Sequence, residues 1–280
     1  MKIDNSKLKR NIFIVGASSK LSQSIKEKYV NHNIIDIYRE TYKYWVGVDA
    51  QELIHDFFEK EISENSIIFI PAAILNPNIS NEQILKINYD LPLNIIEALK
   101  KYNARIVTFG TIFEKMGSSN NNYVNSKIKL SSRIEELVQD KHRITHFRLH
   151  TLYGKDYPNE FMFLGQIFSA IKNKTEFQMT SGEQIREYHH YDDVTASIYD
   201  LLIKDTNGVF EMTYGNGMRL KDLATQIFSF FEMNQLLKIG LKNIDYKDKF
   251  QNDYLKNDDL NTASFREPIN GITEYLKQII

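Results

Sequence analysis

The chain has 280 residues, of which 42% are hydrophobic and 25% charged, and its formal net charge is -1. This is the composition of a globular protein that can bury a large core, and the balanced charge argues against nucleic acid or an anionic membrane as a partner. The absence of cysteine excludes disulfides, thiolate nucleophiles and cysteine metal ligands. No apolar run reaches the ~20 residues of a membrane helix, and the first residues lack the apolar core of a signal peptide, so we expect a cytoplasmic protein.

Short apolar runs alternate with segments of helical periodicity along the first half of the chain. Helical patterns begin near Leu21, Leu53, Ser80 and Tyr123, and Pro92 is expected to kink the third of these helices. The apolar runs predict buried strands at 12–15, 34–37, 67–70, 105–108 and 145–149. This repeated alternation predicts an α/β fold with a doubly wound parallel sheet of the Rossmann type.

The alternation loosens after Gly154, where short strands and further helices, one from about Leu220, are expected. We therefore predict a Rossmann domain over 1–155, to which 186–205 return. A smaller mixed α/β lobe over 156–185 and 206–280 is expected to bind the substrate. A cleft between the two parts is the expected substrate site.

The first predicted strand runs into Gly16-Ala17-Ser18-Ser19-Lys20-Leu21-Ser22. In dinucleotide-binding proteins such a strand-to-helix turn lets helix-terminal N–H groups hold a pyrophosphate. Only the first of the usual glycines is present, but small serines permit close approach and their hydroxyls could donate to phosphate. The alternative is a plain turn without a ligand. The candidate cofactor contacts are Gly16, Ser18, Ser19, Lys20 and Leu21.

The end of the second predicted strand bears on the choice of cofactor. NAD-binding proteins usually place an acidic residue there, whereas Tyr38-Arg39 offers a guanidinium suited to the 2′-phosphate of NADP. We therefore favour NADP over NAD. Asp36 favours NAD if the strand ends two residues earlier, and Arg39 as an ordinary surface arginine is the alternative.

Tyr123 and Lys127 stand four residues apart on a predicted helix, which places the phenol and the ammonium on one face. A neighbouring cation stabilises phenolate and lowers a pKa that is normally about 10, so Tyr123 is a candidate proton donor. Thr111 follows the preceding strand and is a candidate partner. The spacing alone is common, and a solvated helix surface is the alternative.

The order of these residues resembles that of the extended short-chain dehydrogenases/reductases that act on nucleotide sugars, over nearly the whole chain. The matching positions are Gly16 with Leu21, Ala72-Ala73, Asn88, Gly110-Thr111, Tyr123 to Lys127, Arg148-Leu149 to Tyr153-Gly154, and Arg186 to Asp192-Asp193. Gly110-Thr111, Thr180-Ser181-Gly182 with Arg186, and the short chain most resemble the 4-ketoreductases that make 3,6-dideoxyhexoses, such as CDP-paratose and CDP-abequose synthases.

The resemblance implies catalytic roles for three residues. Tyr123 would give a proton to the carbonyl oxygen as hydride arrives from the nicotinamide, Lys127 would hold the nicotinamide ribose, and Thr111 would hydrogen-bond the reacting oxygen.

It also implies binding roles. Asn88 would lie on the nicotinamide side, and Asp49 would contact adenine. Ala72 and Ala73 would line the dinucleotide, and Arg186 would grip the substrate diphosphate.

The residues directly after Thr111 indicate which reaction of the family to expect. Dehydratases of this family carry an Asp-Glu pair directly after the threonine, but here Ile112-Phe113 occupy that place, and the epimerase/reductases that use cysteine are excluded. We therefore expect NADPH-dependent reduction of an NDP-4-keto-6-deoxyhexose, CDP-linked, for surface polysaccharide synthesis. A 4-epimerase that retains NAD and a non-catalytic dinucleotide-binding protein remain alternatives. The family also implies a homodimer through the helices near Ser80 and Tyr123.

Three histidines are further candidate site residues. His150 follows a strand end, where it could touch the sugar, and a structural histidine is the alternative. His189-His190 precede Asp192-Asp193, but adjacent strand residues point to opposite faces and Asp192 fits a helix N-cap. We therefore expect no metal site.

Overall fold

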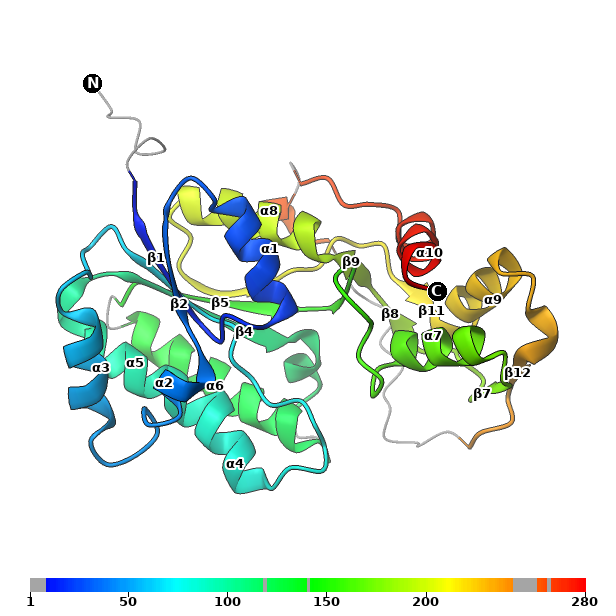
Figure 1. Cartoon of the computed structure of the whole chain (residues 1–280), viewed down its shortest axis with the longest axis horizontal. Coiled ribbons are helices and arrows are strands. Elements are labelled where there is room, and N and C mark those ends of the chain that lie inside the picture. Colours follow the sequence, from blue (N-terminus) through cyan, green and yellow to red (C-terminus); the bar gives the residue numbers. More distant parts are fainter. Residues whose placement is uncertain (1–8, 118–119, 140–141, 244–255, 261–262) are drawn as a thin grey trace. The chain divides into compact units, whose positions relative to one another are not determined.

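The computed structural model describes residues 9–117, 120–139, 142–243, 256–260 and 263–280 (Figure 1). The chain divides into two compact units. Unit 1 comprises Met1–Leu149 and Ile198–Glu211, and unit 2 comprises His150–Ser197 and Met212–Ile280. Among the described residues, no helix combines the length and the apolar character needed to span a membrane.

A six-stranded sheet forms the centre of unit 1. Its order is β10-β5-β4-β3-β1-β2, and every neighbouring pair is parallel. The strands are β1 (Asn11–Val15), β2 (Asn33–Ile37), β3 (Ile67–Ile70), β4 (Arg105–Thr111), β5 (Ile144–Leu149) and β10 (Gly208–Glu211). The first two βα units extend the sheet to one side and the later ones to the other, so the prediction of a Rossmann-type doubly wound sheet is confirmed.

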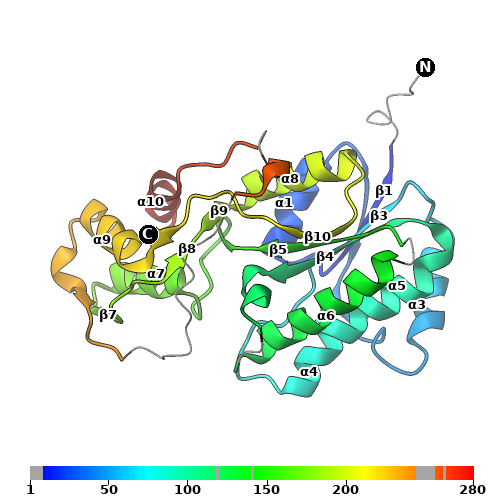
Figure 2. The same cartoon turned by 180° about the vertical axis from the view of Figure 1, so that it is seen from behind.

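Helices cover both faces of this sheet (Figures 1 and 2). One face carries α1 (Lys20–Lys28) and the second half of α8 (Tyr191–Ile203); the other carries α3 (Ala50–Phe58), α5 (Leu91–Leu99) and α6 (Asn122–Gln139). On the second face, Phe13, Ile68 and Ile106 of the sheet belong to one core cluster with Ile54 and Ile134 of the helices. Burial on both faces is why the strands read as continuous apolar runs.

The helix predicted from Ser80 is built in three parts. Ser80 caps α4 (Asn81–Leu85), since its hydroxyl accepts a hydrogen bond of 3.3 Å from the Gln83 N–H. A π-helical segment, η2 (Lys86–Asp90), then leads into α5, which has Pro92 in its first turn. Proline lacks the N–H that would continue the regular ladder, and the irregularity lies in the turn that precedes it.

Shorter elements complete unit 1: α2 (Arg39–Tyr42), η3 (Lys100–Tyr102) and η4 (Ile112–Met116).

Within its described residues, unit 2 contains three strand pairs, three whole helices and the first half of α8. The pairs are β6 (Thr151–Tyr153) with β9 (Tyr188–His190), β7 (Phe177–Met179) with β12 (Leu237–Ile239), and β8 (Ile185–Arg186) with β11 (Met218–Arg219). The helices are α7 (Phe163–Asn173), α9 (Leu220–Phe230) and α10 (Pro268–Ile279), with the short turns η5 (Asn234–Leu236) and η6 (Asp258–Leu260). Ile167, Leu223, Phe228 and Ile272 lie in their shared core.

The division differs from the boundaries predicted from the sequence. Unit 1 ends its first segment at Leu149 rather than at 155, and the returning segment is Ile198–Glu211 rather than 186–205. The reason lies in two sets of short strands. Residues 185–190 form β8 and β9 within unit 2, whereas the four residues of β10 pair with β5 and complete the sheet of unit 1.

Candidate active site

Gly16 directly follows β1, at the point where the backbone just after the neighbouring strand β3 passes close to it. Its φ is +95°, and a Cβ placed there would lie 2.8 Å from the backbone of Ala72. The Ala72 N–H donates to the Val15 carbonyl at 3.0 Å, which holds the two strand ends together. Only glycine fits both the left-handed φ and this approach. The turn therefore has the tight backbone that a bound pyrophosphate requires, with Ala72 beside it, and the contacts of Ala72 and Ala73 with a dinucleotide stay predictions.

Two of the three serines after Gly16, Ser19 and Ser22, form a hydrogen bond with each other within the turn. The Ser22 hydroxyl donates to the Gly16 carbonyl at 2.8 Å, and the Ser19 and Ser22 hydroxyls are 2.6 Å apart. Because the single proton of Ser22 is used, Ser19 must be the donor between them. Ser19 also caps α1 by accepting from the Ser22 N–H at 3.1 Å. In this conformation neither hydroxyl can donate to a phosphate, contrary to the expectation from sequence. The donors that remain for a phosphate are the exposed Ser18 and the N–H groups at the start of α1.

Asp36 is engaged within the structure and does not stand at the strand end. Its Oδ2 accepts from the Lys26 ammonium at 2.9 Å and from the Tyr38 hydroxyl at 3.0 Å. The strand β2 ends at Ile37, and Arg39 follows as an exposed residue. The strand thus ends two residues before Arg39, and the contact of Arg39 with a 2′-phosphate stays a prediction. Asp49 is exposed at the start of α3, and its contact with adenine stays a prediction.

Thr111 is the last residue of β4 and also the N-cap of η4, where it forms a capping box with Glu114. The Thr111 N–H donates to Glu114 Oε1 at 2.7 Å, and the Thr111 hydroxyl accepts from the Phe113 N–H at 3.3 Å. The hydroxyl keeps its own proton for a further acceptor. A Cβ on Gly110 would lie 1.9 Å from Glu114 Oε1, so this glycine is required by the close approach of the carboxylate.

Glu114 anchors a buried polar network that the sequence analysis missed. Its carboxylate accepts from Arg148 Nε at 2.9 Å and lies 3.3 Å from His146 Nε2, while His146 Nδ1 is 2.7 Å from the Thr108 hydroxyl. Burial alone would raise the pKa of Glu114, but His146, the Thr111 N–H and Arg148 hold it below the usual value. Burial lowers the pKa of His146 despite Glu114. The capping-box spacing from Thr111 to Glu114 was the available signal.

Tyr123 and Lys127 lie in the first turns of α6, as the spacing predicts, but the expected lowering of the tyrosine pKa is wrong for the protein without ligand. Burial raises the pKa of Tyr123, and the negative charge of Glu114 raises it further. Burial lowers the pKa of Lys127 to about 8, and Glu114 opposes this shift. The phenol therefore stays protonated at neutral pH, which is the state that a proton donor needs.

Lys127 is the most exceptional polar group of this site. Its side chain is buried, with the residue 3% exposed, yet its ammonium has no ion pair or hydrogen bond within the described part of the chain. The Tyr123 hydroxyl likewise has no hydrogen bond within the described part of the chain. Buried charges are normally paired, because an unpaired one loses its hydration without compensation. A ligand that offers hydroxyl oxygens would supply the missing partners, as a ribose does.

Asn88 is fully buried behind the site. Its amide exchanges two hydrogen bonds with the backbone of Ile74, at 2.8 and 3.0 Å, and donates to the Ser126 hydroxyl at 3.1 Å. It thus fixes the loop after β3 against the helix that carries Tyr123 and Lys127. Its position on the nicotinamide side stays a prediction.

Two of the predicted substrate contacts lie in unit 2. Arg186 on β8 is 8% exposed, and its Nη1 donates to the Ile185 carbonyl at 2.8 Å. His150 is buried, with Nε2 3.0 Å from the Thr213 hydroxyl and 3.9 Å from Glu187. Both predictions remain untested by this arrangement, although His150 has the contacts of a structural histidine.

A cavity of about 620 Å³ lies beside β8 and β11 and is lined by Arg219. This arginine pairs with Asp222 at 2.6 Å, and its side chain is 48% exposed. Arg219 is thus more accessible than Arg186, and sequence reasoning missed it because the β8–β11 pairing that positions it joins distant segments.

The two adjacent histidines have different partners, as residues on a strand should. His189 Nε2 lies 2.8 Å from Glu187, and His190 Nδ1 accepts from the Asp192 N–H at 3.2 Å. Helix α8 begins at Tyr191, so Asp192 lies in its first turn and the predicted N-cap is wrong. The Asp192 N–H, at the start of the helix, instead donates to the ring nitrogen of His190.

The sheet order, the glycine turn and the Tyr123–Lys127 pair define a Rossmann-type protein of the short-chain dehydrogenase/reductase class. The chain belongs to the NAD dependent epimerase/dehydratase family, whose model matches residues 12–212. The predicted resemblance and the prediction of an enzyme of this class are confirmed at that level.

Solved structures share the fold at low sequence identity. A dTDP-4-dehydrorhamnose reductase ortholog from Clostridium acetobutylicum is 19% identical, with a TM-score of 0.73 over 96% of this chain and 99% of that one. A dTDP-4-dehydrorhamnose reductase from Bacillus anthracis in complex with NADP is 17% identical, with a TM-score of 0.75 over 97% and 99%. UDP-glucose 4-epimerase from Thermotoga maritima with UDP-glucose is 15% identical, with a TM-score of 0.78 over 96% and 99%. Among curated proteins, none matches the chain significantly.

Proposed function

We propose that this chain is a cytoplasmic NADPH-dependent reductase that converts an NDP-4-keto-6-deoxyhexose into the corresponding alcohol. The observation that carries the proposal is the pair formed by Lys127, a buried ammonium without a partner in the described residues, and Tyr123, a protonated phenol one helical turn before it. Thr111, with an unused hydroxyl proton, ends the strand that precedes this helix. These are the groups that a ketone reduction needs from the protein.

The roles follow from the state of each group. When bound, NADPH supplies the hydride that reduces the carbonyl carbon. Tyr123 gives its phenolic proton to the carbonyl oxygen as negative charge develops there, and the Thr111 hydroxyl donates a hydrogen bond to the same oxygen. Lys127 binds the nicotinamide ribose hydroxyls and, once so solvated, stays cationic and stabilises the phenolate left on Tyr123.

NADPH is favoured over NADH by the end of β2. Arg39 is exposed there, and the nearby carboxylate of Asp36 is neutralised by Lys26. A guanidinium binds a phosphate with two parallel hydrogen bonds, and Lys26 offsets the charge of Asp36, although Asp36 Oδ1 has no hydrogen-bond partner among the described residues. The NADP complex of the reductase from Bacillus anthracis is consistent with this choice for the fold.

The nucleotide and the pathway rest on the sequence resemblance. Gly110-Thr111 and Thr180-Ser181-Gly182 with Arg186 resemble the corresponding residues of reductases that act on CDP-linked sugars, so we propose a CDP-linked substrate and a role in surface polysaccharide synthesis. The reductases among the similar structures are named for a dTDP-linked sugar. The experiment therefore compares sugars that are linked to different nucleotides.

The test is a reduction assay with purified protein, NADPH or NADH, and freshly generated 4-keto-6-deoxyhexoses linked to CDP, dTDP, UDP and GDP. We expect loss of nicotinamide absorbance and an alcohol at C4 in the recovered sugar, with the CDP-linked compound turned over fastest. A Tyr44→Phe control, which alters an exposed phenol, should keep the full rate. If NADPH binds and none of the sugars is reduced, the proposal fails.

A 4-epimerase is the second candidate, and the match to UDP-glucose 4-epimerase over nearly both whole chains favours it at the level of the fold. An epimerase regenerates its own cofactor, so it would purify with NAD and consume none. Absorbance and mass spectrometry of the supernatant after denaturation separate the two: stoichiometric NAD indicates the epimerase, and its absence the reductase. Dinucleotide binding without any turnover would instead indicate a non-catalytic protein.

We also propose a homodimer formed through the helical layer of α4 and α6. The two helices lie side by side, and Lys129 on α6 sits 4.1 Å from the ring centre of Tyr89 in η2. Light scattering during gel filtration should give twice the 32.8 kDa mass of the chain. A monomer at micromolar concentration would contradict this.

A further inference from the structure

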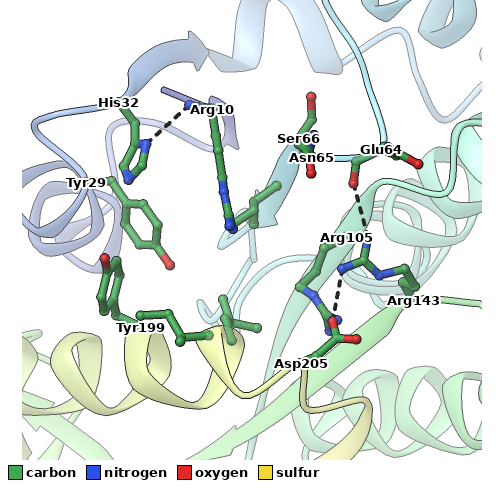
Figure 3. A pocket seen from close by; sticks show the side chains of 13 residues that line it. Arg10, Tyr29, His32, Glu64, Asn65, Ser66, Arg105, Arg143, Tyr199 and Asp205 are labelled. Atoms are coloured by element: carbon green, nitrogen blue, oxygen red, sulfur yellow. Dashed lines mark hydrogen bonds and ion pairs between the residues drawn. The ribbon is translucent and has the colours of Figure 1, made fainter. Parts of the chain in front are cut away.

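A second polar cavity lies in unit 1, at the end of the central sheet opposite to the end that carries Gly16 and Thr111. It has a volume of about 380 Å³ and is shown in Figure 3. Arg10 directly precedes β1, Ser66 directly precedes β3, Arg105 begins β4, and Arg143 directly precedes β5. The cavity is thus at the amino ends of the strands, whereas the candidate active site lies at their carboxyl ends, where parallel sheets usually bind ligands.

Arginines dominate the wall of this cavity. Arg105 and Arg143 both donate to Oδ1 of one carboxylate, Asp205, the second at 3.0 Å. Arg105 Nη1 also donates to the Thr145 hydroxyl at 3.0 Å and the Thr206 carbonyl at 2.6 Å. Each guanidinium has five N–H donors. Arg105 uses three of them within the described chain, so two remain for another acceptor.

Arg143 is used in the same way. Its Nη1 donates to the carbonyls of Glu64 and Asn103 at 3.1 and 3.2 Å, and Nη2 to Asp205. Three arginines and two carboxylates line the cavity, so its formal charge is positive.

A buried phenol adds a further donor. Tyr29 is 2% exposed, and its hydroxyl has no hydrogen-bond partner among the residues the structure describes, although it points into the cavity toward the end of Arg10 (Figure 3). Burial raises the pKa of this phenol, so the hydroxyl carries its proton. His32 beside it accepts from the Arg10 N–H through Nδ1 at 3.3 Å, which leaves the Nε2 proton of a neutral ring as a donor.

We propose that this cavity binds a small phosphate monoester, with the phosphoryl oxygens on Arg10, Arg105 and the Tyr29 hydroxyl. A wall of N–H and O–H donors requires a ligand rich in acceptors, and a phosphoryl dianion offers three oxygens to such a fork of guanidinium groups. The volume exceeds that of a lone ion and lies at the lower end of small-molecule sites, about 300–1,000 Å³, which suits a sugar phosphate. The site is separate from the proposed reaction and does not depend on it.

The experiment is calorimetric titration of the whole chain with ribose 5-phosphate, inorganic phosphate, sulfate and ribose. It is done at constant ionic strength and pH 7.5, with and without saturating NADPH. We expect saturable binding of ribose 5-phosphate, weaker binding of phosphate, and none of ribose. Tyr29→Phe should weaken binding by about threefold to tenfold, the loss of one hydrogen bond. Arg10→Met should weaken it by at least about tenfold, the loss of a charge-assisted pair.

Matched controls alter the same residue types elsewhere. Tyr44→Phe and Arg133→Met change exposed side chains and should leave the affinity within about twofold. Tyr29→Phe removes a hydroxyl without a partner, so it should fold at least as stably as the wild type. Inorganic phosphate that binds as tightly as ribose 5-phosphate would identify the ion itself as the ligand and overturn the monoester. Absence of saturable binding, or equal losses in the control variants, would overturn the site.

Discussion

The carboxylate of Glu114 accepts a 2.7 Å hydrogen bond from the backbone N–H of Thr111. This bond turns the chain sharply at the end of β4, so that a residue of the central sheet also starts the next helical turn. The same carboxylate bonds to Arg148 on the neighbouring strand, and its side chain is fully buried. The position of Thr111 is therefore fixed by a buried carboxylate that is itself bound to the neighbouring strand.

Replacing Glu114 by glutamine tests this arrangement. An amide keeps the shape and the acceptor for Thr111, but the charge that compensates Arg148 is lost. We expect the free energy of unfolding to fall by about 2 kcal/mol, less than for a fully isolated pair because Glu135 and Glu211 also lie near Arg148. Urea denaturation measures this. Glu136→Gln on the exposed face of α6 should change stability by less than about 0.5 kcal/mol, and an equal effect of both would contradict the argument.

Lys127→Met should stabilise the protein without ligand. The folded pKa is lowered from 10.5 to about 8, so the unfolded chain binds more protons between these values and wild-type stability rises with pH across that window. Below about pH 8 the full cost of burying the ammonium is present, and methionine removes up to about 3 kcal/mol of it. The gain should be largest at pH 7 and shrink by pH 9.5 in urea denaturation. Lys60→Met, which alters an exposed side chain shortly after α3, should show no such dependence.

Tyr123→Phe should lower kcat by about 10²–10⁴-fold while the affinity for NADPH stays within about threefold, because only the proton donor is lost. In the wild type, kcat/KM should fall above about pH 8, where Lys127 of the free enzyme loses its proton, rather than near the pKa of an ordinary tyrosine. Steady-state rates from pH 6 to 10 give both results. Full activity of the phenylalanine variant would rule out the assigned role.

Gly16→Ala should abolish dinucleotide binding and lower the free energy of unfolding by about 1–3 kcal/mol. The added methyl would meet the Ala72 backbone at 2.8 Å in a residue with φ of +95°. Gly47→Ala is the matched control, since the nearest atom to its Cβ would be 3.8 Å away. Thermal melts and NADPH titration of both variants decide the matter, and similar behaviour of the two would refute the close approach at Gly16.

Arg39→Ser should weaken NADPH binding by about tenfold or more and leave NADH binding within about twofold, because only the former carries the phosphate that the guanidinium meets. Fluorescence titration with each dinucleotide measures the ratio. Arg133→Ser serves as the control for loss of an exposed arginine. If the affinities for both dinucleotides fall equally in the Arg39→Ser variant, Arg39 does not bind the 2′-phosphate.

The sheet could be predicted from sequence because buried parallel strands leave apolar runs that surface segments lack. The strand β3 matches its run at 67–70, and β1, β2 and β5 each begin one residue earlier than predicted. The extension of β4 over Phe109, Gly110 and Thr111 was not predicted, because polar Thr108 interrupts the apolar run and the last two residues of the strand are not apolar. Helix α8 crosses from unit 2 into unit 1, and nothing in local periodicity marks where that happens.

The candidate site was predictable where it rests on residue order and not where it rests on burial. Spacing and order led to Thr111, Tyr123 and Lys127 as catalytic residues, and their roles stay predictions. The pKa shift of Tyr123 was predicted with the wrong sign, because desolvation and the charge of Glu114 come from packing that spacing does not reveal. Ser19 was predicted as a cofactor contact and the serine hydroxyls as possible donors to phosphate, but the protons of Ser19 and Ser22 are used locally, which only the three-dimensional turn shows.

The sixth strand of the sheet has a consequence for how the protein is made. β10 pairs with β5 from Gly208 opposite Thr145 to Glu211 opposite Arg148, so a ribosome must add some sixty further residues before that partner exists. Until then the outer backbone groups of β5 form an open edge that can recruit strands of other chains. Fragments that stop near Leu149 should therefore precipitate, and the nascent protein should require a chaperone at that stage of translation.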